Sequence, residues 1–274
     1  ERRDHHATVV LEAESGAFLY VMGGVRDMTT PLVGTEYAPI SADGSLGAFQ
    51  TGAALAEMMI GHSIAVVDDV VVLSAGIRPV GGKGVLTTKV DVTRVQADGS
   101  LGAWTSGPEL AASRFHHSST SFERWVYVVG GLTGEGKDST PSVERAEVSV
   151  DGTVSAWTEV TALPEKRSHH AVIAYDGALW VTGGLSGDPA GVHTSFSNVL
   201  RAPIDETGGL GAWTVVGELP MTLATHSSFV HAGALYVVGG VEGRSTNTAA
   251  VGRATIGTDG ATPWQQVRAI TIPL

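Results

Sequence analysis

The sequence predicts an all-β protein made of five repeated units of four antiparallel strands each, which is a five-bladed β-propeller. A double glycine, replaced by Ala-Gly in one copy, recurs every 52–56 residues, with its second glycine at Gly24, Gly76, Gly131, Gly184 and Gly240. Each unit later has a turn followed by an aromatic residue, at Phe49, Trp104, Trp157, Trp213 and Trp264. Units of about 50 residues cannot bury both faces of their own sheet, so we expect them to stack radially.

The fourth unit shows why each element is expected to be a strand. Residues 170–175 are an apolar run that ends at Asp176-Gly177, a tight hairpin signal. Residues 178–182 return and end at Gly183-Gly184, residues 198–204 form a third strand after a loop of variable length, and Thr207-Gly208 leads into a fourth strand carrying Trp213. No segment has a capped 3.6-residue apolar period, so we expect no helix longer than a turn.

The repeat boundaries predict one domain over residues 1–274. The expected blades are approximately residues 3–58, 59–113, 114–166, 167–222 and 223–274. Within the chain, 13 residues separate each aromatic residue from the next repeated histidine, and on a joined circle His6 would follow Trp264 by 10 plus 6, or 16, positions. The spacing across the joined ends is therefore close to the spacing within the chain, and this favours a complete five-bladed ring over a fragment of a larger propeller. We also expect the protein to be a monomer.

The composition excludes several classes of function. The 17 basic and 28 acidic residues give a net charge of −11, which would repel nucleic acid and anionic membranes. The chain has no cysteine, so it has no disulfide, thiolate metal site or cysteine nucleophile. Its unbroken apolar runs are too short to enter a bilayer as a spanning segment.

The Tyr-Val-Val-Gly-Gly segments and the later tryptophan resemble the repeat of kelch β-propellers. The resemblance covers essentially the whole chain, although kelch propellers more often have six or seven blades and only Tyr37 matches the family's tyrosine in the third strand. It implies an interaction platform. The Asp-Gly-Ser-Leu-Gly-Ala-Trp turn is similar to that of bacterial kelch-like proteins, which implies a periplasmic, surface or secreted location.

A site is expected on the face that carries the loops between second and third strands. In a propeller these loops lie on the same face as the start of every first strand. They are the long loops of this sequence, at residues 25–36, 77–90, 132–142, 185–197 and 241–249. Long ordered loops on a rigid frame commonly carry function.

One histidine recurs at the start of each first strand, and we expect a ring of these side chains at the mouth of the axial channel: His6, His62, His117, His170 and His226. Imidazoles bind zinc, copper, nickel or iron, so the ring is a candidate site for one transition-metal ion. The alternative is that the histidines pack between blades, as is common in kelch repeats. A second histidine precedes three of them, at His5, His116 and His169. Because neighbouring strand residues point to opposite faces, both columns cannot face the axis.

Basic residues precede three of these histidines by three positions: Arg3, Arg114 and Arg167. They could bind an anionic small molecule or a carboxylate side chain, or else pair with acidic neighbours at the surface. His193, in the fourth long loop, could join such a site.

These observations leave three hypotheses for function. The first is a non-enzymatic scaffold that binds a small molecule, peptide or protein on the loop face. The second is a metal-binding protein or metal-dependent enzyme that uses the histidine ring. The third is a structural repeat without a fixed ligand. No acidic residue can be singled out as a general acid or base.

Overall fold

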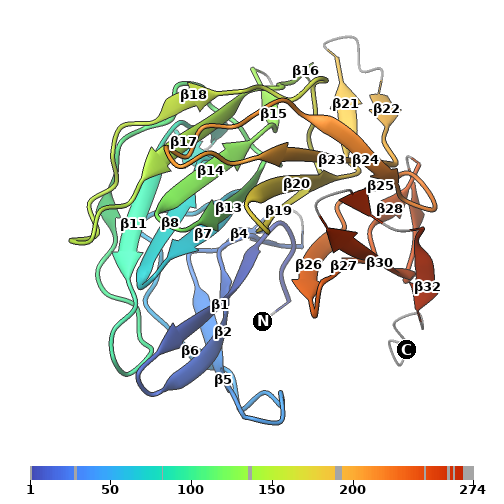
Figure 1. The fold of residues 1–274 in the computed structure, drawn as a ribbon. Helices are drawn as coiled ribbons and strands as arrows, with labels where there is room; N and C mark the ends of the chain where they lie inside the picture. The colour runs from blue at the N-terminus through green and yellow to red at the C-terminus, as the bar shows by residue number, and fades with distance from the viewer. Residues whose placement is uncertain are drawn as a thin grey trace. The chain divides into compact units, whose positions relative to one another are not determined.

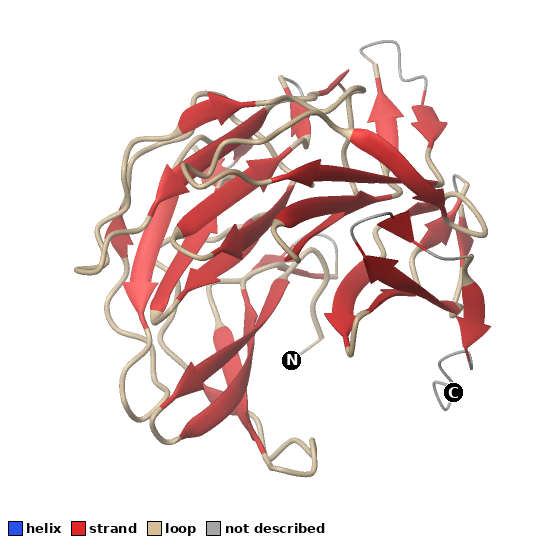
Figure 2. Cartoon of the chain, in the orientation of Figure 1, coloured by secondary structure: helices blue, strands red, loops and turns tan. Residues whose placement is uncertain are grey.

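The computed structural model describes residues 2–27, 30–81, 83–134, 138–188, 193–243, 245–257, 260–261 and 263–267. Within these residues the chain forms strands, turns and loops but no helix (Figure 1, Figure 2). No helix in the described part of the chain is long and apolar enough to cross a membrane.

The described strands form sheets in which the chain runs back and forth between neighbours. The first sheet has the order β1 (Ala7–Ala13), β2 (Gly16–Met22), β5 (Thr35–Ile40) and β6 (Gln50–Thr51). The second has the order β7 (Ser63–Val67), β8 (Val70–Ser74), β11 (Val90–Arg94) and β12 (Thr105–Ser106). The third has the order β13 (Ser118–Phe122), β14 (Trp125–Val129), β17 (Val143–Glu147) and β18 (Thr158–Val160).

The last two sheets repeat the same order. The fourth has β19 (Ala171–Tyr175), β20 (Ala178–Thr182), β23 (Asn198–Pro203) and β24 (Thr214–Glu218). The fifth has β26 (Ser227–His231), β27 (Ala234–Val238), β30 (Val251–Gly257) and β31 (Gly260–Ala261), and β32 (Gln265–Val267) also pairs with β30. The predicted all-β repeat of four-stranded antiparallel sheets is therefore confirmed. The number of blades in the ring stays a prediction.

The strands of the fourth repeat match their predicted bounds closely. The turn between β19 and β20 has left-handed φ at both Asp176 (49°) and Gly177 (67°), as a tight two-residue hairpin requires. One detail was wrong, because β24 begins after Trp213 instead of containing it. The Trp213 indole lies before the strand and donates from Nε1 to the Thr161 carbonyl at 3.0 Å.

Each long loop contains short strands that the sequence did not predict. Four loops form two-stranded ribbons, namely β3 (Val25–Arg26) with β4 (Thr30–Pro31), β9 (Ile77–Val80) with β10 (Lys83–Leu86), β15 (Leu132–Thr133) with β16 (Asp138–Ser139), and β21 (Leu185–Gly187) with β22 (His193–Ser195). In the fifth loop, β28 (Val241–Glu242) pairs with both β25 (Leu223–Ala224) and β29 (Thr246–Asn247). We call these loop strands the ribbons.

The chain divides into two compact units. Unit 1 comprises residues 1–116, 123–127 and 146–158, and unit 2 comprises residues 117–122, 128–145 and 159–274. Prediction of a single domain with the blade boundaries given above stays a prediction.

Each unit has a core in which neighbouring sheets bury complementary faces. In unit 1, Phe18, Tyr20 and Met22 of β2 pack with Val71 and Leu73 of β8. In unit 2, Trp180 of β20 packs with Leu235 and Val237 of β27 and is completely buried. The repeated aromatic residue before the double glycine is completely buried in three repeats, at Tyr20, Tyr127 and Trp180, and half-buried at Tyr236, so it contributes to the packing between sheets.

Candidate functional site

The repeated histidines lie at junctions between successive sheets. The side chains of His62, His117, His170 and His226 are buried, with 6–7% of their surface exposed, whereas His6 is exposed. In three repeats the first glycine of the pair makes room for the next repeat's imidazole. A Cβ atom at Gly23, Gly130 or Gly183 would lie within 2.8–2.9 Å of Cε1 of the histidine in the following sheet, respectively His62, His170 and His226.

The second glycine makes room for the histidine of its own sheet. A Cβ atom at this glycine would lie 2.8–3.1 Å from the histidine Cβ, in the pairs Gly24 with His6, Gly76 with His62, Gly184 with His170 and Gly240 with His226. These glycines also have left-handed φ values of 89–103°. The double glycine and the histidines therefore pack together, since a larger residue would collide with an imidazole at the first glycine and with a histidine Cβ atom at the second.

Burial keeps these imidazoles neutral. It lowers the pKa of His62 to about 3, with smaller contributions from His6 and Arg78. It also lowers the pKa of His226 to about 4, and that of His170 falls well below its ordinary value for the same main reason. His226 Nε2 lies 2.8 Å from the Thr182 hydroxyl. Neutral imidazoles can bind metals, but here their immediate surroundings are glycine backbone and neighbouring strands.

The geometry of this column does not assemble a set of metal ligands. Among the described residues, no three histidine, cysteine, aspartate or glutamate side chains form a group that could hold a metal ion. The imidazoles of His62, His170 and His226 each lie against a glycine of the preceding sheet. The metal-binding role predicted for His6, His62, His117, His170 and His226 stays a prediction.

The arginines that precede the histidines are buried, not displayed at a surface. Arg114 and Arg167 have no exposed surface, and the Arg3 side chain is 3% exposed. Arg167 donates from Nη1 to the Gly183 carbonyl at 2.6 Å and to Asn198 Oδ1 at 2.9 Å, and burial lowers its pKa to about 10. Its guanidinium also lies 4.0 Å from the centre of the Phe196 ring.

Arg3 makes the equivalent contacts in the first repeat. Its Nη1 donates to the carbonyls of Gly23 at 2.9 Å and Gly34 at 2.8 Å, and its Nη2 lies 2.6 Å from Glu36 Oε2. Arg3 and Arg167 therefore join the double glycine of their own sheet to the start of its third strand. The ligand-binding role predicted for Arg3, Arg114 and Arg167 stays a prediction, although Nη1 of Arg3 and Nη1 of Arg167 already donate to carbonyl groups of the protein.

The residue before each repeated histidine has an unexpected backbone conformation. Its φ is left-handed in all five repeats, at His5 (53°), Gly61 (61°), His116 (51°), His169 (56°) and Thr225 (53°). We had separated the two histidine columns by the alternation of side chains along an extended strand. That reasoning was wrong, because this position is not extended.

Each ribbon lies beside the linker that precedes its sheet. Backbone pairs join Asp4 to Val25, Ile60 to Ile77, Ser168 to Leu185 and Ala224 to Val241. In these four repeats the long loop and the start of the first strand are therefore at the same end of the sheet, as predicted. We call this end the ribbon face.

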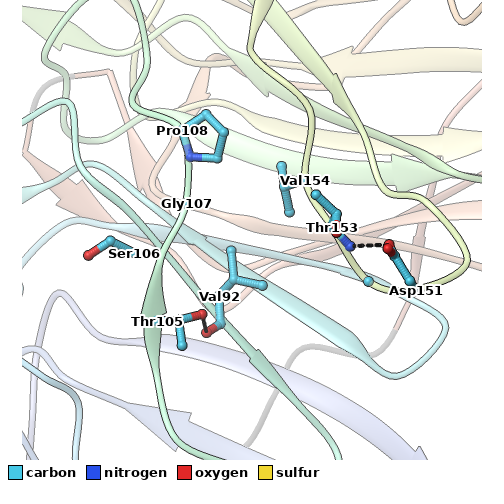
Figure 3. A pocket seen from close by; sticks show the side chains of 9 residues that line it. Val92, Thr105, Ser106, Gly107, Pro108, Asp151, Thr153 and Val154 are labelled. Atoms are coloured by element: carbon cyan, nitrogen blue, oxygen red, sulfur yellow. Dashed lines mark hydrogen bonds between the residues drawn. The ribbon is translucent and has the colours of Figure 1, made fainter.

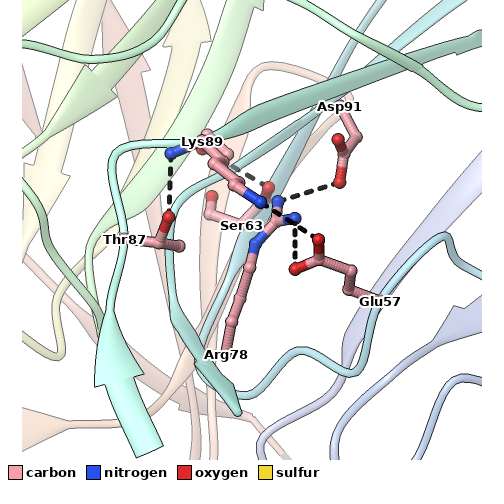
Figure 4. Close-up of polar contacts among 7 residues, drawn as sticks. Glu57, Ser63, Arg78, Thr87, Lys89 and Asp91 are labelled. Atoms are coloured by element: carbon pink, nitrogen blue, oxygen red, sulfur yellow. Dashed lines mark hydrogen bonds and ion pairs between the residues drawn. The ribbon is translucent and has the colours of Figure 1, made fainter. Parts of the chain in front are cut away.

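The β9–β10 ribbon is held at its base by buried charges (Figure 4). Arg78 is 3% exposed and pairs with Asp91 of β11 at 2.8 Å and with Glu57 at 3.3 Å. Lys89 reaches the same Glu57 carboxylate at 3.0 Å and lowers its pKa together with Arg78. Arg78 was not singled out from the sequence, because its partners Glu57 and Asp91 lie 21 and 13 residues away in the chain.

Ribbons of successive repeats are joined by hydroxyl side chains in unit 2. Ser139 of β16 accepts a hydrogen bond from the Gly187 amide at the end of β21 at 2.9 Å. Ser195 of β22 donates to the Gly243 carbonyl, which follows β28, at 2.9 Å. These two cross-links fix the three ribbons of unit 2 to one another.

The ribbon face exposes both apolar and polar side chains. Val80 and Val85 of the β9–β10 ribbon are 61% and 44% exposed. His193, the predicted loop histidine, is exposed on β22 opposite Gly187. Its ligand-binding role stays a prediction. The two valines were not singled out from the sequence, because the ribbon that displays them was not predicted.

Hollows occur elsewhere in the units, among them one of about 460 Å³ beside Arg124 and Glu147 in unit 1 and the following two. One, of about 270 Å³, lies in unit 1 between residues 105–108 and the turn at 151–154 (Figure 3). Its Asp151 carboxylate accepts hydrogen bonds from Ser149 and from the Thr153 amide, which lower its pKa to about 2. The other, of about 540 Å³, lies in unit 2 beside Tyr175, Phe229 and His231. Asp151 is thus a turn residue and is unsuited to act as a general acid at neutral pH.

The sequence is similar to several kelch-like proteins, although no family model matches it. "Kelch-like protein 38" of Mus musculus is 26% identical over 167 residues, which are 61% of this chain and 26% of the mouse protein. "Beta-scruin" of Limulus polyphemus is 33% identical over 92 residues, 34% of this chain and 10% of that protein. "Kelch-like protein terF" of Aspergillus terreus is 27% identical over 190 residues, 66% of this chain and 39% of the fungal protein.

The fold is similar to a solved structure described as "Structure of YjhT". The two superpose with a TM-score of 0.73 over 96% of this chain and 84% of the other, at 12% sequence identity. The chain spans between a tenth and about two fifths of the three relatives named above. The repeated double glycine, the four-stranded sheets and these similarities identify the chain as a kelch-repeat β-propeller.

Proposed function

We propose that this chain is a non-enzymatic scaffold that binds a protein or peptide partner through its ribbon face. The observation that carries the proposal is the β9–β10 ribbon, which displays Val80 and Val85 to solvent on a base fixed by Arg78. Exposed apolar side chains on a rigid support are suited to a partner, since little conformational entropy is lost on binding.

The ribbons of unit 2 support the same kind of role. Ser139 and Ser195 join ribbons of successive repeats there, so these loops are already ordered without a partner. Kelch propellers related to this chain generally mediate protein–protein interactions. The arginines and histidines that could have supplied chemistry are mostly buried in structural contacts.

The test compares exposed valines at different places in unit 1. Val80→Asp and Val85→Asp should abolish capture of a partner from cell extract and direct binding of that partner once it is purified. Val150, which is fully exposed in the turn after β17, provides the matched control, and Val150→Asp should bind as the unaltered protein does. Equal binding by all three variants would place the contact surface elsewhere and overturn the proposal.

A further inference from the structure

The left-handed residues before the repeated histidines form a chain of backbone hydrogen bonds. In unit 1 the Gly61 amide donates to the His5 carbonyl at 3.0 Å, and the His116 amide donates to the Gly61 carbonyl at 3.1 Å. Left-handed φ costs roughly 1–2 kcal/mol for a residue other than glycine, so the fold holds His5 and His116 against an intrinsic preference. This backbone arrangement fixes where both side chains start.

Gly61 allows the two histidine side chains to meet. The His5 and His116 rings come from the first and third repeats, and their centroids are 5.0 Å apart at an interplanar angle of 55°. Between them in the repeat order stands Gly61, which has no side chain. A Cβ atom at Gly61 would lie 3.2 Å from the Phe115 ring and 3.7 Å from the His116 ring. The glycine therefore leaves room for the two imidazoles to come together.

The Asp4 carboxylate lies beside the His5 ring. Its Oδ1 lies 3.1 Å from His5 Nδ1 and also accepts a hydrogen bond from the His5 amide at 2.7 Å. The geometry at Nδ1 is not that of a hydrogen bond, so Asp4 acts on the ring as a nearby negative charge. The Phe115 ring packs against His116 with centroids 4.4 Å apart and provides an apolar wall on that side.

The spacing of the rings fits a shared metal ion. With metal–nitrogen bonds of about 2.0–2.1 Å and about 1.1 Å from each nitrogen to its ring centre, two imidazoles on one tetrahedral ion have centroids about 5.2 Å apart. The observed separation is 5.0 Å. A site with two protein ligands is compatible with there being no group of three candidate ligands among the described residues. Water or a group from a bound partner would fill the other positions.

We propose that His5 and His116 together bind one divalent transition-metal ion, with Asp4 as a nearby negative charge. This site uses the histidines that precede the repeated column, and it is independent of His6, His62, His117, His170 and His226. It also does not depend on the partner-binding role of the ribbon face, because the metal is measured without any partner.

Zinc binding to the 274-residue chain without an affinity tag tests the proposal. Calorimetric titration with zinc chloride should give one ion per chain, and His5→Ala or His116→Ala should weaken the association at least tenfold. His231→Ala is the matched control, since His231 is exposed on β26 in the other unit, and it should leave the titration unchanged. Asp4→Asn should weaken binding several-fold with unchanged stoichiometry.

The folded state of each variant is checked by its circular dichroism spectrum and melting temperature. If His116→Ala fails to fold, His116→Gln provides the second test, because glutamine is a poor zinc ligand of similar length. Binding of cobalt(II) gives a separate readout, since its visible absorption should disappear in the His5 and His116 variants alone. Absence of zinc binding, or equal loss in the His231 control, would overturn the proposal.

Discussion

The starts of the fourth and first repeats share an arginine and two histidines at the same spacing but differ in their environments. Arg167 and Arg3 are both buried, and each binds the carbonyl of the first glycine in its own sheet. His170 is 6% exposed and lies against Gly130 of the preceding repeat, whereas His6 is exposed. The contact from the arginine to the first glycine is therefore the same in both repeats. The environment of the histidine differs between them.

The arginine variants have the largest expected effect on the free energy of unfolding, and they test the contacts that each arginine makes within its own repeat. Arg167→Met should lower the free energy of unfolding by about 3–5 kcal/mol, because Gly183 O and Asn198 Oδ1 lose buried charged donors. Arg3→Met should cause a loss similar to within about 1 kcal/mol, since its contacts are also internal to its repeat. Urea denaturation measures both. If Arg167→Met lowered the free energy of unfolding and Arg3→Met did not, the two arginines would not be equivalent.

The histidine variants test the difference in environment between His170 and His6. His170→Ala should cost about 2–3 kcal/mol, since it removes a buried ring from a close-packed junction. His6→Ala should change stability by less than about 0.5 kcal/mol, because the side chain is exposed. The two variants are compared by their urea midpoints under one set of conditions. Equal losses would mean that His6 is buried in solution.

Mild acid provides a third measurement at the same junctions. His62, His170 and His226 have lowered pKa values when folded, so the unfolded chain binds protons first as pH falls below about 6.5. Stability is therefore complete above that pH and falls as pH decreases toward the folded values near 3 and 4, by at most about 1.4 kcal/mol per pH unit for each histidine.

The window from pH 6 to pH 5 isolates the histidines. The lowered pKa values of Glu36 and Glu57 mean that these carboxylates lose their contribution at lower pH. His226→Gln should reduce the stability change across this window by about 1 kcal/mol. An unchanged pH dependence in His226→Gln would show that His226 is not buried in its neutral form.

The repeat pattern predicted the strands well because their signals are local. The Asp176-Gly177 hairpin and the strands on either side need only turn geometry and an apolar run. The environment of Arg167 was not predictable, because its acceptors Gly183 and Asn198 lie 16 and 31 residues away in the chain. The residues before the repeated histidines have left-handed φ, and among them only Gly61 indicated this conformation from the sequence, since histidine does not by itself indicate left-handed φ.

The smallest predicted effect concerns the hydrogen bond between one buried imidazole and a threonine hydroxyl. His226 Nε2 lies 2.8 Å from the Thr182 hydroxyl, which is also 3.0 Å from Ser228 Oγ. Thr182→Val keeps the shape but removes the hydroxyl, so it should cost about 0.5–1.5 kcal/mol in the free energy of unfolding. The loss should shrink in a His226→Ala background, because the two groups then no longer interact, and a double-mutant cycle in urea measures that difference. The Thr182 hydroxyl thus adds a side-chain contact to a junction whose other contacts come from the glycine pair. Additive losses in the cycle would show that this contact does not stabilise the junction.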